Sequence, residues 1–142
     1  MGLRPGPLSC IGRNYITDST LEKFYSPSGP LSHMPGYEFR PQQLELALAV
    51  QEFLRSPLER TFAAEAPPGV GKTFALLVPA LREAAGERRI LFLTAGIALQ
   101  EQLIGKDLPR LAGLLDRDFS FGLLKGRANY VCLRRAGSLS GP

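Results

Sequence analysis

The sequence predicts an α/β fold, in which a parallel sheet is flanked by helices. Two short apolar runs of strand length, residues 61–65 and 90–93, alternate with longer stretches of helical periodicity. Such alternation is typical of a parallel sheet, and a run that is apolar throughout suits a strand covered on both faces. A glycine-containing loop joins the first run to the next helix, which is where phosphate-binding loops occur. We therefore expect part of a P-loop NTPase sheet, with another strand at residues 119–124.

The helices expected around this sheet follow from apolar spacing and from proline positions. Pro41 suits the first turn of a helix, and Pro57 ends that helix. A second helix is expected from Lys72 to about Ala85; it is apolar nearly all round and contains Pro79, so we expect it to be buried and kinked. Residues 97–104 and 107–115 are expected to form further helices. The apolar face of the first helix consists of Leu46, Ala47, Val50, Phe53 and Leu54.

Three regions are expected along the chain. Residues 1–36 contain five prolines and five glycines, which disfavours long helices or strands and predicts an irregular N-terminal segment. Residues 37–135 hold the ordered α/β part, and residues 136–142 form a tail. Because a sheet of two or three strands would leave unpaired edges, we expect the chain to be part of a larger domain.

The charge of the chain is unevenly distributed. The net charge is +4, but residues 1–116 contain 12 basic and 12 acidic groups, so the whole excess lies in residues 117–142. A basic stretch can contact phosphates, although a solvated tail has the same composition. The two cysteines are too far apart to suggest a disulfide framework, and neither a membrane span nor a secretory signal is recognisable. We expect a cytoplasmic protein with no membrane partner.

The strongest chemical signal is the loop at residues 66–73, which fits the pattern G-x-x-x-x-G-K-[ST] except that alanine replaces the first glycine. Glycine permits the close approach of backbone N–H groups to phosphate oxygens, and the following helix presents its positive end to them. The lysine supplies a cation for the β- and γ-phosphates of ATP, and the threonine hydroxyl is placed to bind Mg²⁺. A plain Gly/Pro turn is the alternative. The loop residues are Ala66, Pro67, Pro68, Gly69, Val70, Gly71, Lys72 and Thr73.

Three further segments accompany this loop. They read YEFRPQQ at residues 37–43, TAGIALQEQL at residues 94–103 and KGRANYVCL at residues 125–133. With the loop, in this order, they resemble the iron–sulfur superfamily 2 DNA helicases, specifically the DinG branch related to XPD. The resemblance runs from about Leu21 to Arg135. It implies the N-terminal part of a RecA-like motor domain that couples ATP hydrolysis to movement on single-stranded DNA.

The resemblance implies a role for several individual residues. Arg40 and Gln43 are similar to the adenine-recognising Q motif, and a glutamine amide has both the donor and the acceptor that the adenine edge requires. The alternative is that Gln43 only lies in the first turn of a helix and that Arg40 is a surface charge. Thr94 and Gln100 fall in the segment that contacts single-stranded DNA in this family, although a plain strand-to-helix connection is the alternative. Lys125 and Arg127 are the basic residues of the third segment.

Cys132 matches the first of four cysteines that bind a [4Fe–4S] cluster in this family. The other three ligands, the acidic Walker B motif and the second motor domain with its arginine finger have no counterpart in residues 133–142. We therefore expect the chain to bind nucleotide but to hydrolyse little ATP by itself. Two other classes stay open, namely a different P-loop enzyme such as a small-molecule kinase, and a nucleic-acid-binding module without catalysis.

Overall fold

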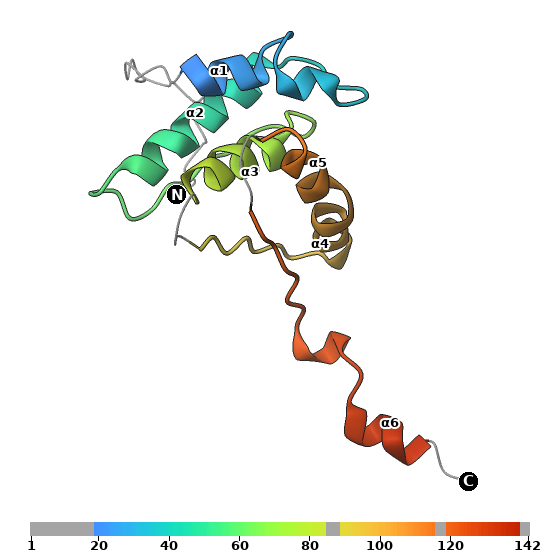
Figure 1. Ribbon diagram of the computed structural model, residues 1–142. Coiled ribbons are helices and arrows are strands. Elements are labelled where there is room, and N and C mark those ends of the chain that lie inside the picture. Colours follow the sequence, from blue (N-terminus) through green and yellow to red (C-terminus); the bar gives the residue numbers. More distant parts are fainter. Residues whose placement is uncertain (1–18, 85–88, 116–118, 140–142) are drawn as a thin grey trace, which may run out of the picture. The chain divides into compact units, whose positions relative to one another are not determined.

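The computed structural model describes residues 19–84, 89–115 and 119–139 (Figure 1). The chain divides into two compact units, Met1–Arg88 and Arg89–Pro142. The first unit contains the loop at residues 66–73, and the second contains the segments at residues 94–103 and 125–133.

The first unit is helical in its described part. Helix α1 spans Ser19–Tyr25, a 3-10 turn η1 spans Pro30–His33, α2 spans Pro41–Arg55 and α3 spans Lys72–Glu83. Residues 19–25 and 30–33 belong to the segment that the sequence predicts to be irregular, so part of that segment is helical. Helices α2 and α3 pack side by side and form the centre of the unit (Figure 1).

Helix α2 begins where the sequence predicts, because Pro41 occupies its first turn and Arg40 before it is extended. One face of α2 is buried, but polar and apolar residues share it: Gln43, Ala47, Val50 and Gln51. The predicted apolar face is therefore only partly correct. Leu46, Phe53 and Leu54 of the predicted face are only half-buried, whereas Gln43 and Gln51 are buried.

Helix α3 begins at Lys72, directly after Gly71 in the left-handed region (φ 87°). The predicted burial of this helix is confirmed, since five residues are covered: Ala75, Leu77, Val78, Pro79 and Ala80. Pro79 lacks an N–H group, so the carbonyl of Ala75, four residues earlier, receives no hydrogen bond from it.

Contacts at both ends of α2 and α3 show that these helices run in the same direction. At their N-terminal ends, the Gln43 side chain contacts Gly71. At their C-terminal ends, Arg55 Nε lies 2.6 Å from Glu83 Oε1. Two parallel elements need a connection that runs back from the end of the first to the start of the second. Residues 56–71 provide this connection, and the 66–73 loop lies at its end.

The second unit contains a helical stretch interrupted by a wider turn. Helix α4 spans Ile97–Gln102, a π-helical turn η2 spans Leu103–Asp107, and α5 spans Leu108–Ala112. Pro109 explains the wider turn, since it cannot donate to the carbonyl of Gly105 and its ring would collide with that carbonyl in a regular helix. A 3-10 turn η3 at Arg127–Asn129 and helix α6 at Leu133–Leu139 complete the described part.

The predicted α/β fold is wrong for this structure, because residues 19–84, 89–115 and 119–139 contain no β-strand. The three segments expected as strands, residues 61–65, 90–93 and 119–124, have no regular secondary structure. A strand is held by hydrogen bonds to a neighbouring strand and by burial of its side chains. Here Leu91 and Leu93 are 79% and 81% exposed, so the apolar run that indicated a buried strand is not covered.

None of the helices that the structure describes combines the length and the apolar character that a bilayer span requires.

Candidate nucleotide-binding loop and basic segment

The 66–73 loop turns at two glycines in the left-handed region. Gly69 has φ 84° and Gly71 has φ 87°, and Gly36, which also has a positive φ value among the described residues, is a glycine too. This region costs little for glycine and is unfavourable for residues with a Cβ atom. The glycines of the predicted loop are therefore required by its backbone.

Two side chains of the preceding segment hold the carbonyl groups of this loop. Arg40 donates from Nη1 to the carbonyl oxygen of Gly69 at 2.8 Å, and Gln43 donates from Nε2 to that of Gly71 at 2.9 Å. In a trans peptide, the carbonyl of one residue and the N–H of the next point in opposite directions. The N–H groups of Val70 and Lys72 are therefore turned away from Arg40 and Gln43.

Lys72 reaches back over the loop. Its Nζ atom donates to the carbonyl oxygens of Ala66 at 2.9 Å and Pro67 at 2.8 Å. Thr73 follows as the second residue of α3, and its side chain is partly exposed. A cation, a hydroxyl and outward-turned N–H groups thus gather at one helix start, which is the donor set that a phosphate group and its Mg²⁺ require.

Gln43 and Gly71 are packed so closely that the glycine is required for a second reason. A Cβ atom at Gly71 would collide with the amide nitrogen of Gln43. Gln43 itself is only 4% exposed. The structure therefore uses this glutamine to hold the loop, a role that the sequence pattern alone did not indicate.

Tyr25 and Tyr37 extend this set of contacts toward the N-terminus. The Tyr25 hydroxyl donates to the Phe74 carbonyl at 2.8 Å, and the Tyr37 hydroxyl donates to the Tyr25 carbonyl at 2.6 Å. Burial raises the pKa of Tyr25, and the nearby Tyr37 adds to this, whereas Arg82 opposes it. Burial also raises the pKa of Tyr37, against the effect of Arg40. Both phenols are thus held protonated, as hydrogen-bond donors.

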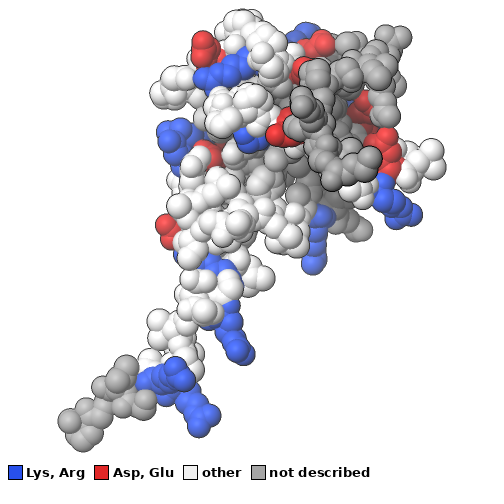
Figure 2. Space-filling model, turned by 180° about the vertical axis from the view of Figure 1, so that it is seen from behind, with Lys and Arg blue, Asp and Glu red and all other residues white. Residues whose placement is uncertain are grey.

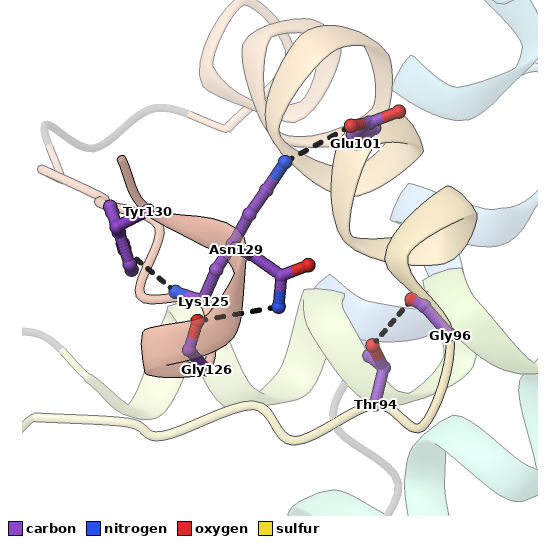
Figure 3. Close-up of polar contacts among 7 residues, drawn as sticks. All are labelled: Thr94, Gly96, Glu101, Lys125, Gly126, Asn129 and Tyr130. Carbon is purple, nitrogen blue, oxygen red and sulfur yellow. Dashed lines mark hydrogen bonds and ion pairs between the residues drawn. The ribbon is translucent and has the colours of Figure 1, made fainter. Parts of the chain in front are cut away.

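In the second unit, an ion pair joins the segment at residues 125–133 to helix α4 (Figure 3). Lys125 Nζ lies 3.0 Å from Glu101 Oε1. The backbone N–H of Lys125 donates to the Tyr130 hydroxyl at 2.9 Å, and Asn129 Nδ2 donates to the Gly126 carbonyl at 3.3 Å. These bonds close residues 125–130 into a turn that presents Lys125 to α4. No sequence pattern indicates that Glu101 pairs with Lys125.

The other residues predicted to contact DNA, which are Thr94, Gln100 and Arg127, differ in their exposure and in their hydrogen bonds. Thr94 uses its hydroxyl as a donor to the Gly96 carbonyl at 3.1 Å (Figure 3), so a phosphate would have to replace that bond. Gln100 is half-buried, and its Oε1 atom has no hydrogen-bond partner within the described part of the chain. Arg127 is exposed in η3.

Basic side chains dominate the end of the second unit. Residues 119–139 contain Lys125, Arg127, Arg134 and Arg135 but neither aspartate nor glutamate. Figure 2 shows lysine and arginine side chains, and no acidic ones, close to the C-terminal end of the chain. This stretch can attract phosphates over a distance set by the salt concentration.

Cys132 is exposed and directly precedes α6. Within the described ranges, no three His, Cys, Asp or Glu side chains are grouped so that they could hold a metal ion. Cys10 lies outside the described residues. One exposed thiol does not make a cluster site by itself, so the expected role of Cys132 as a [4Fe–4S] ligand stays a prediction that depends on three further cysteines.

The chain is similar to curated helicases over most of its length. It is 38% identical over 112 residues to the ATP-dependent DNA helicase YoaA of Escherichia coli K12 and 39% identical over 119 residues to YoaA of Haemophilus influenzae, which covers 78% and 83% of the chain. It is 37% identical over 108 residues to the ATP-dependent DNA helicase DinG of Escherichia coli K12, or 75% of the chain. The chain is homologous to a segment of the DinG and YoaA helicases.

This relationship covers only a small part of each relative. The chain spans 17% and 18% of the two YoaA proteins and 15% of DinG. No family model and no solved structure matches the chain. The DinG-like resemblance predicted from four short segments is nevertheless confirmed, because it extends over three quarters of the chain or more.

Proposed function

We propose that the chain is the ATP-binding segment of an ATP-dependent DNA helicase, with the nucleotide phosphates bound at the 66–73 loop. The observation that carries this proposal is the anchoring of the loop carbonyls by Arg40 and Gln43. It leaves the N–H groups of Val70 and Lys72 facing away from these side chains, at the N-terminal end of α3. Phosphate binding uses N–H groups in this arrangement.

Each residue of the site has a defined task in this proposal. Lys72 leaves the carbonyls of Ala66 and Pro67 and neutralises the β- and γ-phosphates, and the Thr73 hydroxyl binds Mg²⁺. Mg²⁺, when bound with ATP, supplies charge neutralisation on the phosphate oxygens. Arg40 and Gln43 lie next to the loop, and the Gln43 amide has a second N–H and an oxygen acceptor, the groups that an adenine edge requires.

The replacement of Lys72 tests the nucleotide site. Lys72→Ala removes a charge-assisted contact, so ATP binding to the 142-residue chain should weaken by about 1.5–3 kcal/mol in calorimetry. Lys23→Ala removes an exposed lysine of α1 in the same unit and should leave the affinity unchanged. Equal ATP affinities of the wild type and Lys72→Ala would rule out the proposed site.

We further propose that the second unit contacts single-stranded DNA through Thr94, Gln100, Lys125 and Arg127. The support comes from the basic composition of residues 119–139 and from the similarity to the YoaA and DinG proteins, which are DNA helicases. Phosphate contacts by lysine and arginine release counterions, so the affinity should fall steeply with salt.

The salt dependence of DNA binding tests this second part. The double variant Lys125→Ala/Arg127→Ala should lower the slope of log affinity against log salt by about 1.4, since each phosphate contact on a single strand contributes about 0.7. Arg110→Ala, which removes an exposed arginine of α5, is the matched control. An unchanged slope in the double variant would exclude Lys125 and Arg127 from the DNA site.

A further inference from the structure

The start of α3 is held by three side chains that all come from the segment before it. Arg40 and Gln43 hold the carbonyls of Gly69 and Gly71, and Tyr25 holds the carbonyl of Phe74. These acceptors lie in the loop, at the N-cap of α3 and in its first turn. The three bonds therefore fix the backbone on both sides of Lys72 and Thr73.

Tyr25 is the most deeply placed of the three donors. Its side chain is 0% exposed, and it reaches an acceptor 49 residues away in the sequence. A carbonyl oxygen has two lone pairs, so Phe74 can accept this bond in addition to its bond within the helix. The bond from the Tyr25 hydroxyl is thus additional to the helical bonds of α3, and it joins the first turn of α3 to α1.

Tyr25 is itself fixed by the start of the next segment. Tyr37 donates to the Tyr25 carbonyl at 2.6 Å, and Tyr37 lies just before Arg40 and Gln43 in the sequence. The bonds from Tyr37 to Tyr25 and from Tyr25 to Phe74 connect the residues around Arg40 with the first turn of α3. This path runs through α1 and does not involve the loop.

We propose that Tyr25 is a positioning residue for the nucleotide site: its buried hydroxyl, bound to the Phe74 carbonyl, sets the place of the α3 turn that carries Lys72 and Thr73. The proposal rests on the proposed nucleotide-binding function. It extends the site to α1, which lies outside the 66–73 loop and is joined to α3 through the Tyr25 hydroxyl. Residues ahead of the 37–43 segment then contribute to the binding of the phosphates.

Tyr25→Phe tests this role, because phenylalanine keeps the buried ring and removes only the hydroxyl. The loss of one hydrogen bond should weaken ATP binding about two- to tenfold. AMP, which lacks the β- and γ-phosphates, should lose less affinity than ATP, so the ratio of the two affinities should fall. A purely structural role would weaken both nucleotides equally or would change only the unfolding midpoint.

Two further variants make every outcome decisive. Ser32→Ala removes the hydrogen bond from Ser32 to the Gly29 carbonyl (2.7 Å), which lies in the same unit but does not reach α3, and should leave the ratio of ATP to AMP affinity unchanged. If Tyr25→Phe does not fold, Tyr37→Phe takes its place, since it removes the bond that fixes Tyr25. An unchanged ratio of ATP to AMP affinity in the folded variant overturns the role of Tyr25. An ATP affinity that is the same in wild type and Lys72→Ala overturns the nucleotide site itself.

Discussion

The backbone of Gly71 and the side chain of Gln43 depend on each other. The left-handed backbone of Gly71 starts α3, and the absence of a side chain there leaves room for the Gln43 amide. The amide then bonds to the carbonyl of the same glycine. A glycine in a phosphate-binding pattern is usually explained by the approach of the phosphate. Here the protein's own side chain occupies the space that a Cβ would fill.

Gly71→Ala should therefore destabilise the chain by more than backbone strain alone. The left-handed conformation costs about 1–2 kcal/mol for a residue with a Cβ atom, and the collision with Gln43 adds to this. Gly69→Ala has the same type of backbone strain, but nothing lies near its added Cβ, so it should cost less. The free energy of unfolding from urea titrations measures both variants.

A double variant separates the two contributions. Gly71→Ala/Gln43→Ala removes the side chain that the new methyl group would meet. Its loss of unfolding free energy should therefore be smaller than the sum of the losses of the two single variants. Gly105→Ala is the control for an added methyl group, because Gly105 has an open Cβ position and an ordinary backbone. Strict additivity of Gly71→Ala and Gln43→Ala would contradict the close packing of this pair.

At the scale of elements, sequence patterns predicted the helices better than the strands. Pro41 and the loop before Lys72 marked the starts of α2 and α3 correctly, because a fixed φ value and a glycine turn act locally. Apolar runs predict strands at residues 61–65, 90–93 and 119–124. A strand also needs hydrogen bonds to a partner that can be distant in the sequence, and the described residues contain no strand.

The contacts that assemble the candidate site were predictable only in part. The loop residues followed from one short pattern, and Arg40 and Gln43 followed from a family resemblance. Tyr25 gave no signal beyond being an aromatic that can pack, because its acceptor is a backbone carbonyl 49 residues away. Backbone acceptors are not encoded by residue type, so no sequence pattern points to such a bond.

The unfolding free energy of the unit that contains α1 should fall at alkaline pH. Burial raises the pKa of Tyr25 above the usual value near 10, so the folded state disfavours the phenolate more strongly than the unfolded state does. The stabilisation by protonated Tyr25 is complete below about pH 10 and is lost as the pH rises through the raised pKa. The midpoint of urea unfolding, followed from pH 8 to 11, should therefore fall at the upper end.

Variants of two tyrosines show whether Tyr25 causes this decline. Tyr25→Phe cannot ionise, so the decline above pH 10 should become markedly smaller. Tyr130→Phe removes the hydroxyl of a tyrosine that is half exposed in the second unit, and the decline should persist. A profile that is the same in wild type and Tyr25→Phe would show that other groups control the alkaline stability.

At the scale of the whole chain, large apolar side chains are exposed in several of the described segments. They include Leu91 and Leu93 in the run after the first unit, Leu124 before η3, and Leu133 at the start of α6, each at least 79% exposed. Single exposed leucines are ordinary, whereas several neighbouring ones form patches that promote association. The charge of +4 opposes association only weakly, because its excess lies in residues 117–142.

The 142-residue chain should therefore associate with itself as its concentration rises, and the run at residues 90–93 should contribute strongly. Leu91→Ser/Leu93→Ser replaces two side chains that are 79% and 81% exposed, so it should shift sedimentation toward the monomer without lowering the unfolding midpoint. Leu77→Ser changes a leucine that is only 4% exposed in α3 and should destabilise the fold by about 2–5 kcal/mol, which would increase association instead. Sedimentation velocity over a range of concentrations distinguishes these outcomes. A wild-type chain that stays monomeric throughout would show that the exposed leucines do not form an associating patch.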